Sequence, residues 1–204
     1  MIRAYASGIF PMSETATDEE VFWVRPEQRG VIPLDGFHIS RSLRRKIRAQ
    51  QFDIRTDTSF EAVVRGCADR SETWINPSLT RVYSDLFEMG VTHSVECWQG
   101  EELVGGIFGL SLGAAFFGES MFSRRTDASK IALAALVARL NAGGYLLFDT
   151  QFLTPHLATL GGVEISREDY QHRLGKALTG KGEFYSLSDP LSAEAILHFS
   201  TQMS

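Results

Sequence analysis

Gly118-Glu-Ser-Met-Phe-Ser-Arg-Arg-Thr-Asp-Ala-Ser-Lys130 is the stretch that decides the fold. It predicts the end of a strand carrying the carboxylate of Glu119, then a polar and basic turn, then the start of a helix. A second run, Phe148-Asp-Thr-Gln151, places another carboxylate and an amide at the end of a later strand. Polar groups at neighbouring strand ends beside a basic helix start indicate a site for an anionic, activated substrate.

The segments around this stretch predict helices, then a meander of strands, and then a further helix and strand. Asn76 is a typical N-cap residue, and Pro77 after it suits the first turn of a helix. Serine is also a preferred N-cap residue, which applies to Ser40 and Ser166. This order predicts an α+β arrangement of layers. We expect helices over 41–48, 59–68, 127–141 and from 77 up to Gly90, and strands over 22–24, 31–34, 52–56, 92–98, 103–110, 114–119 and 145–149.

Length and composition suit one medium domain, or one domain with a small appendage. Hydrophobic residues make up 44% and charged residues 22% of the 204 residues, as in ordinary globular chains. The start lacks a secretory signal, no apolar run could span a bilayer, and two cysteines make no disulfide framework, so we expect a cytoplasmic protein. The scattered histidines argue against a metal site. The net charge of −5 argues against broad nucleic-acid binding but not against a local basic stripe.

A cluster of arginines lies on one face of the helix expected over 41–48. Leu43 and Ile47 fall on another face of it. A solvated face is the ordinary interpretation. The alternative is a row of arginines that binds successive nucleic-acid phosphates, and the clustering of arginines in an acidic chain favours it. These residues are Arg41, Arg44, Arg45 and Arg48.

The three-strand meander followed by a helix and a strand resembles the core of the GNAT acyltransferase fold. In members that use coenzyme A, a glycine-rich turn before the central helix holds the pyrophosphate on backbone amides. The matching turn here, Phe122 to Lys130, contains no glycine. This comparison therefore implies acyl transfer from a donor other than coenzyme A.

The chain resembles the leucyl/phenylalanyl-tRNA–protein transferase family from Tyr5 to about Leu174. Each matching run is short, and their shared order makes the resemblance specific. The runs are Gly8-Ile-Phe-Pro11, His38-Ile-Ser-Arg-Ser42, Thr73-Trp-Ile75, His93-Ser-Val-Glu96, Glu102-Leu-Val-Gly-Gly106, Gly118-Glu-Ser-Met-Phe-Ser123, Ala128-Ser-Lys130, Asp149-Thr-Gln151 and His156-Leu-Ala-Thr-Leu-Gly161.

This resemblance implies an enzyme that moves Leu or Phe, and Met less well, from aminoacyl-tRNA to the α-amine of a protein. The acceptor bears an N-terminal Arg or Lys and is thereby marked for N-end-rule degradation. The family implies a cytoplasmic enzyme without cofactor or metal, and we expect a monomer. It also implies a small N-terminal domain, here 1–29 and shortened relative to longer members, followed by a GNAT-like domain over 30–204 with a mainly antiparallel sheet flanked by helices.

The resemblance implies that Asp149 and Gln151 are the catalytic residues. An amide has no useful proton affinity near neutral pH, so our hypothesis is that Gln151 orients the attacking amine and Asp149 offsets its charge. Without the resemblance, Asp149 would be interpreted as a carboxylate that caps the next turn. Glu119 matches a residue that helps to hold the acceptor's N-terminus, and a salt bridge to Arg124 or Arg125 is the alternative.

The resemblance also assigns residues to the aminoacyl group and the tRNA 3′ end. Aromatic positions near that end are matched by Trp74 and Tyr83, and more weakly by Tyr5. A ring there could stack on the terminal adenine. The alternative is an aromatic side chain buried at an interface. Met12 stands where many members have Trp. The expected Leu/Phe pocket residues, which periodicity alone would assign to the core, are Ile107, Phe116, Met121, Leu133, Leu136, Leu140 and Phe148.

Two other functions stay open at this point. One is a GNAT-type N-acyltransferase that uses an acyl-CoA, against which the missing glycine-rich turn counts. The other is a non-catalytic adaptor that binds tRNA or a degron, against which the joint presence of Glu119, Asp149 and Gln151 counts.

Overall fold

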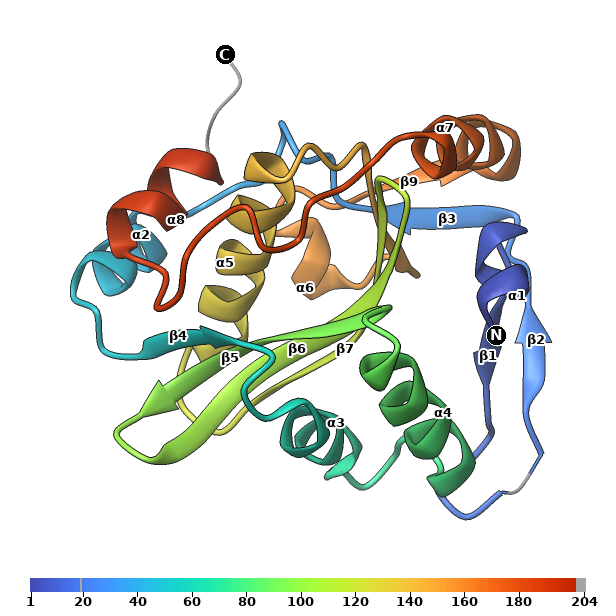
Figure 1. The fold of residues 1–204 in the computed structure, drawn as a ribbon, viewed down its shortest axis with the longest axis horizontal. Helices are drawn as coiled ribbons and strands as arrows, with labels where there is room; N and C mark the ends of the chain where they lie inside the picture. Colours follow the sequence, from blue (N-terminus) through green and yellow to red (C-terminus); the bar gives the residue numbers. More distant parts are fainter. Residues whose placement is uncertain (19, 201–204) are drawn as a thin grey trace.

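The fold is one large twisted sheet with helices on both faces and a small two-stranded sheet beside it (Figure 1). The computed structural model describes residues 1–18 and 20–200. In this part of the chain the large sheet has the order β4-β5-β6-β7-β8-β3-β9, and β7 and β8 are its parallel pair. The strands are β1 (Phe10–Met12), β2 (Phe22–Val24), β3 (Gln28–Val31), β4 (Asp53–Thr56), β5 (Thr92–Gln99), β6 (Glu102–Leu112), β7 (Ala115–Ser123), β8 (Leu147–Gln151) and β9 (Val163–Ser166).

Helices cover the two faces of the large sheet (Figure 1), and the buried apolar side chains of the described residues form three clusters. The central helix α5 packs on β5, β6 and β7, and α3 and α4 cover the opposite face. Because α5 is apolar around its whole circumference, it is buried on all sides. The helices are α1 (Ile2–Ala6), α2 (Arg41–Arg48), α3 (Phe60–Ala68), α4 (Pro77–Glu88), α5 (Ala128–Ala142), α6 (Pro155–Ala158), α7 (Arg167–Thr179) and α8 (Ala193–Phe199).

The helix starts expected from the sequence are confirmed by their capping bonds. The side chains of Ser40, Asn76 and Ser166 each accept a hydrogen bond from the backbone N–H three residues later. At the end of α5, Gly144 has a φ of +71°, a conformation that glycine adopts without strain. These local signals mark the starts of α2, α4 and α7 and the end of α5, whereas α5 begins after Asp127 without a side-chain capping bond.

The sequence correctly predicts a mixed α+β arrangement, a mainly antiparallel sheet and a distinct N-terminal region. β3 lies in the large sheet between β8 and β9, and it includes both residue 29 and residue 30. The domain boundary expected between them stays a prediction. In the described part of the chain, Cys67 and Cys97 are buried and free, no helix is long and apolar enough to cross a membrane, and no group of three or more His, Cys, Asp or Glu is placed to hold a metal ion.

The strand that carries Glu119 is longer than the sequence predicts. β7 continues to Ser123, because β6 supplies pairing partners as far as Gly105. Gly109 pairs with Gly118 and Phe108 with Ser120, so Glu119 is the extra residue of a β-bulge and not the end of the strand. The backbones of β6 and β7 approach closely at this bulge, where a Cβ on Gly109 would lie 2.3 Å from the carbonyl oxygen of Phe117.

Pairing between β7 and β8 stops early, and this opens space between them. The two strands pair from Ala115 with Leu147 to Phe117 with Asp149 and no further. β8 has its own irregularity just beyond this point, where Gly30 and Val31 of β3 pair with Gln151 and Asp149 and leave Thr150 as the extra residue. Two bulges thus flank the place where the parallel pair ends.

Candidate active site

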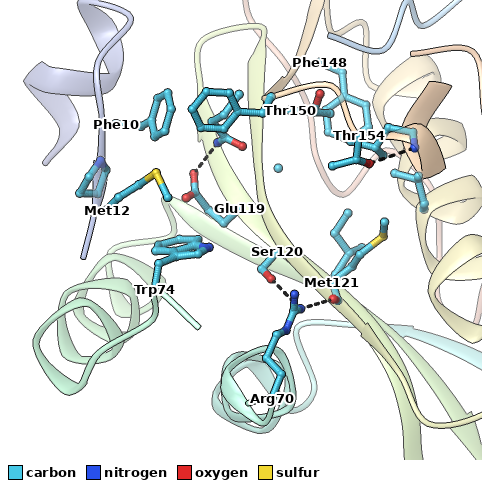
Figure 2. Close-up of a pocket in the computed structure, with 17 residues that line it drawn as sticks. Phe10, Met12, Arg70, Trp74, Glu119, Ser120, Met121, Phe148, Thr150 and Thr154 are labelled. Carbon is cyan, nitrogen blue, oxygen red and sulfur yellow. Dashed lines mark hydrogen bonds between the residues drawn. The ribbon is translucent and has the colours of Figure 1, made fainter. Parts of the chain in front are cut away.

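A cavity of about 250 Å³ lies where β7 and β8 part (Figure 2). Its walls come from both sheets, the start of α6, α5 and the segments before α4, so the N-terminal region completes it. One part of the wall is apolar, and another carries a carboxylate together with amide and hydroxyl groups. The lining residues are Phe10, Pro11, Met12, Arg70, Trp74, Ile107, Gly118, Glu119, Ser120, Met121, Leu133, Phe148, Thr150, Gln151, Phe152, Thr154 and Leu157.

The bulge in β7 turns Glu119 into this cavity. One carboxylate oxygen accepts a hydrogen bond from Gln151 Nε2 at 3.2 Å, and the other accepts one from the Tyr83 hydroxyl at 2.9 Å. Burial raises the pKa of this carboxyl to about 7, although the tyrosine hydroxyls and the Arg29 guanidinium act in the opposite direction. The salt bridge considered from the sequence does not form: Arg124 pairs with Asp69 at 3.5 Å and Arg125 with Glu102 at 3.0 Å.

Tyr83 and Tyr5 form a chain of hydroxyls behind Glu119. Their hydroxyl oxygens lie 3.2 Å apart, and both side chains have no solvent exposure. Burial raises the pKa of both phenols well above the ordinary value, so they are neutral donors. Because neither ring has an exposed face, stacking on a nucleotide base is not available to Tyr5 or Tyr83; they hold the carboxylate instead.

Asp149 is buried and its carboxylate is already fully engaged. Arg29 binds it in a two-point ion pair, with Nε 2.9 Å from Oδ1 and Nη2 2.7 Å from Oδ2. Tyr170 donates its hydroxyl to Oδ2 at 2.7 Å, and the backbone N–H of Gln151 donates to Oδ1 at 2.8 Å. Our hypothesis was that the negative charge of Asp149 offsets the charge of the substrate amine, but Arg29 already balances it. Asp149 contacts the backbone N–H of Gln151 and not its side-chain amide.

Arg29 is the partner that sequence reasoning missed. Its guanidinium lies between the rings of Phe10 and Tyr170, at 4.6 and 4.5 Å from their centroids, and donates to the Gly8 carbonyl at 3.1 Å. It is only 2% exposed. The available signal was an arginine directly before a glycine and an apolar run, Arg29-Gly-Val-Ile-Pro-Leu34, but the distance along the chain to Asp149 hides the pairing.

Gln151 is held in an uncommon backbone conformation. Its φ is +58°, in the left-handed region that side chains other than glycine rarely adopt. Gly30 permits this turn, since a Cβ there would lie 2.5 Å from the carbonyl carbon of Phe152. The neighbouring Thr150 also lines the cavity, and its hydroxyl oxygen is buried without a hydrogen-bond partner among the described residues. Strain and an unpaired polar group at one place are typical of functional sites.

Four of the seven residues expected in the Leu/Phe pocket line the cavity, namely Ile107, Met121, Leu133 and Phe148. The other three, Phe116, Leu136 and Leu140, lie in the buried core and outside the lining. On α5 the reason is the rise of about 1.5 Å per residue, which carries Leu136 and Leu140 away from the cavity along the helix axis. Phe116 lies in the part of β7 that pairs with β8, before the two strands separate.

The remaining residues expected at the tRNA lie in two other places. Trp74 is half-buried at the cavity wall, near Met12 and Phe10 (Figure 2). The arginine helix α2 packs on α8 and α5, with Lys46 paired to Asp127 at the start of α5. Its four arginines form no ion pair with the residues described here. Arg44 is half-buried, and the exposed ones are Arg41, Arg45 and Arg48.

Comparison with known proteins shows which family the chain resembles. The model of the leucyl/phenylalanyl-tRNA protein transferase family matches residues 31–175, and the model of that family's N-terminal domain matches residues 1–27. The chain belongs to this family. Because the family consists of transferases, the protein is an enzyme of that class. The resemblance inferred from the sequence is confirmed.

Relatives named leucyl/phenylalanyl-tRNA–protein transferase align along most of the chain. The protein from Ruegeria is 57% identical over 204 residues, which is 100% of this chain and 97% of the relative. Proteins from Cereibacter sphaeroides and Paramagnetospirillum magneticum are both 60% identical, over 184 and 182 residues. These alignments cover 90% and 87% of this chain, and 86% and 87% of the relatives.

Proposed function

We propose that this transferase moves Leu or Phe, and Met less well, from aminoacyl-tRNA to the α-amine of proteins with an N-terminal Arg or Lys. The acceptor would thereby be marked for N-end-rule degradation, and the reaction would occur in the cytoplasm by a monomer without cofactor or metal. One observation carries the proposal: an apolar cavity has Glu119 and Gln151 hydrogen-bonded to each other on its wall. The family's name agrees with both substrates.

In this proposal the reaction is the attack of the acceptor amine on the aminoacyl ester. The amine nitrogen bonds to the ester carbonyl carbon, the bond from that carbon to the ribose oxygen breaks, and the amine proton ends on the ribose oxygen. An α-amine has a pKa of about 8, so little base strength is required. Glu119 would bind the cationic N-terminus and accept the first proton, which the amine loses before it attacks; the second proton is the one that ends on the ribose oxygen. Gln151 would orient the amine. Positioning of the two substrates supplies most of the rate.

Asp149 then acts as a positioning residue. Its contact with the Gln151 backbone N–H supports the strained conformation that directs Gln151 toward Glu119. Arg29 in turn fixes the position of the Asp149 carboxylate through a two-point ion pair. This assignment replaces the direct interaction between Asp149 and the amine.

The donor would lie with its side chain among Ile107, Met121, Leu133 and Phe148. An apolar pocket separates side chains that differ by one methylene by only about 1–3 kcal/mol, which agrees with use of more than one amino acid. The terminal adenine would stack on Trp74. Phosphates of the tRNA would contact the arginine face of α2, whose four guanidinium groups have no carboxylate partner in the described part of the chain.

The fold relationship that we propose is to the GNAT acyltransferases. It is supported by the antiparallel strands β5, β6 and β7, the central helix α5 and the parallel strand β8, in that order. Transfer from an acyl-CoA is disfavoured by the turn before α5, which has no glycine between Phe122 and Lys130.

A single assay tests the function. The protein is mixed with radiolabelled Leu-tRNA and a peptide that begins with Arg, and labelled peptide is measured. We expect labelled product, and its loss in Glu119→Ala and Gln151→Ala. Transfer from acetyl-CoA without transfer from Leu-tRNA would contradict the proposal, and so would binding of both substrates without product, which is the result expected of an adaptor.

A further inference from the structure

The edge of β7 that faces away from β6 is unpaired over its last residues. Among the described strands, β8 pairs with this edge only as far as Phe117, whereas β7 continues to Ser123. Arg124 donates its backbone N–H to the Val104 carbonyl at 2.7 Å, so the alternation of an antiparallel ladder directs the backbone groups of Met121 and Ser123 outward. The carbonyl of Met121 agrees with this direction, because it accepts a hydrogen bond from Arg70 at 2.7 Å.

This free edge forms the floor of a groove of about 370 Å³. Met121, Phe122 and Ser123 provide the floor, and the ends of α3 and the start of α5 and α6 provide the walls. Arg70 and Met121 line both the groove and the cavity, so the two spaces lie side by side along the edge of β7. The edge of β7 thus runs from Glu119 in the cavity to Ser123 in the groove.

We propose that the acceptor polypeptide binds in this groove as an added β-strand on the edge of β7, with its N-terminal amine at Glu119. The proposal rests on the proposed function, because it assumes a protein acceptor. From Glu119 to Ser123 the strand spans about 13 Å at about 3.3 Å per residue, which accommodates the first four or five residues of an acceptor. That acceptor runs parallel to β7 and occupies the place that β8 leaves after Asp149.

The chemistry of the groove favours a polypeptide over the single-stranded end of a tRNA. Single-stranded nucleic acids bind to open aromatic faces combined with cations. Of the two aromatic rings in the groove, Phe122 is 8% exposed and has the Arg124 guanidinium 5.3 Å from its centroid, and His156 is half-buried. A strand edge with outward N–H and carbonyl groups matches the backbone of an extended peptide, which is how sheets recruit such segments.

The first test uses the unmodified enzyme and N-methylated acceptors. The peptide is one arginine followed by four alanines, and a methyl group replaces the backbone N–H hydrogen of the third, fourth or fifth residue in turn. Because alternate residues of a strand bond to the same edge, the third and fifth positions should behave alike and the fourth should differ. We expect KM for the peptide to rise about 3- to 10-fold at the bonded positions. Equal effects at all three positions, or no effect, would overturn the proposal.

The second test obstructs the groove. Ser129 lies at the start of α5 in the groove wall, so Ser129→Trp fills the space beside the edge. The ratio of KM for arginine amide to KM for the pentapeptide should fall toward one in this variant. Lys176→Trp, on the exposed part of α7, is the matched control and should keep the ratio of the unmodified enzyme.

The outcomes distinguish this proposal from the function on which it rests. Transfer to arginine amide with no gain from the added residues would overturn the groove alone. A rise in KM for Leu-tRNA in Ser129→Trp, with the acceptor ratio unchanged, would assign the groove to the tRNA and overturn the proposal. Absence of transfer even to arginine amide would overturn the proposed function and the groove together.

Discussion

Glu119 is the residue whose environment differs most from its sequence interpretation. The sequence predicts a carboxylate at a strand end beside basic residues, whereas the protein places it in a bulge against Tyr83 and Gln151, with Arg124 and Arg125 paired elsewhere. Bulges are not visible in a single sequence, since one extra residue leaves the alternation of a short strand almost unchanged. The sequence supplies the carboxylate, and the fold determines what surrounds it.

The raised pKa of Glu119 gives a stability prediction. The folded protein retains the proton up to about pH 7, whereas the unfolded chain releases it near the ordinary value, so stability due to this group is present at low pH and is lost as pH rises toward 7. The free energy of unfolding of the unmodified protein, relative to Glu119→Gln, should fall by roughly 1–3 kcal/mol between pH 5 and pH 8. Urea titrations at several pH values measure it, and a difference independent of pH would contradict it.

At the scale of elements, the sequence predicts long helices well because their caps are local. Ser40, Asn76 and Ser166 each act within three residues. Strand ends and cavity walls depend instead on distant partners. β7 extends past Glu119 because Gly105 to Phe108 of β6 lie beside it, and α5 directs Leu133 to the cavity but not Leu136. Periodicity identifies the apolar side chains of α5 and does not reveal which of them border an empty space.

The arginine face of α2 gives a prediction for this element. Replacing Arg41, Arg44 and Arg45 by Gln should raise KM for aminoacyl-tRNA and flatten its salt dependence, by about 0.7–0.9 in the slope of log KM against log salt for each phosphate that the variant no longer binds. The donor aminoacyl-adenosine has no phosphates and should be unaffected. A control with the same charge change replaces the exposed residues Arg3, Arg65 and Arg173. Equal losses on both donors would show that α2 serves only the fold.

At the scale of the whole molecule, Arg29 connects parts that are far apart in sequence. It lies in β3, pairs with Asp149 of β8, contacts the ring of Tyr170 in α7, and bonds to Gly8 beside the ring of Phe10 in the N-terminal region. The α+β class and the positions of α2, α3, α4 and α5 could be predicted from the sequence, whereas α1, α6 and α8 were not predicted. This junction could not be predicted, because its members come from four segments whose proximity only the folded chain establishes.

This junction gives a prediction for the stability of the whole protein. Arg29→Met leaves the Asp149 carboxylate buried without its partner, and we expect a loss of about 3–5 kcal/mol in the free energy of unfolding. Adding Asp149→Asn removes the uncompensated charge and should restore much of that loss. Urea unfolding of the two variants and the unmodified protein provides the comparison. A double variant no more stable than Arg29→Met would show that ion pairing is not the source of the effect.

The bulge in β7 also determines whether the carboxylate can be removed without changing the pairing of the sheet. Gly118 and Ser120 already pair with consecutive residues of β6, Gly109 and Phe108. Removing Glu119 alone would join them into a regular ladder and preserve every pairing on either side. In its register the carboxylate is one extra residue in an otherwise regular β6–β7 ladder, and we expect deletion of Glu119 alone to leave a folded protein that lacks it.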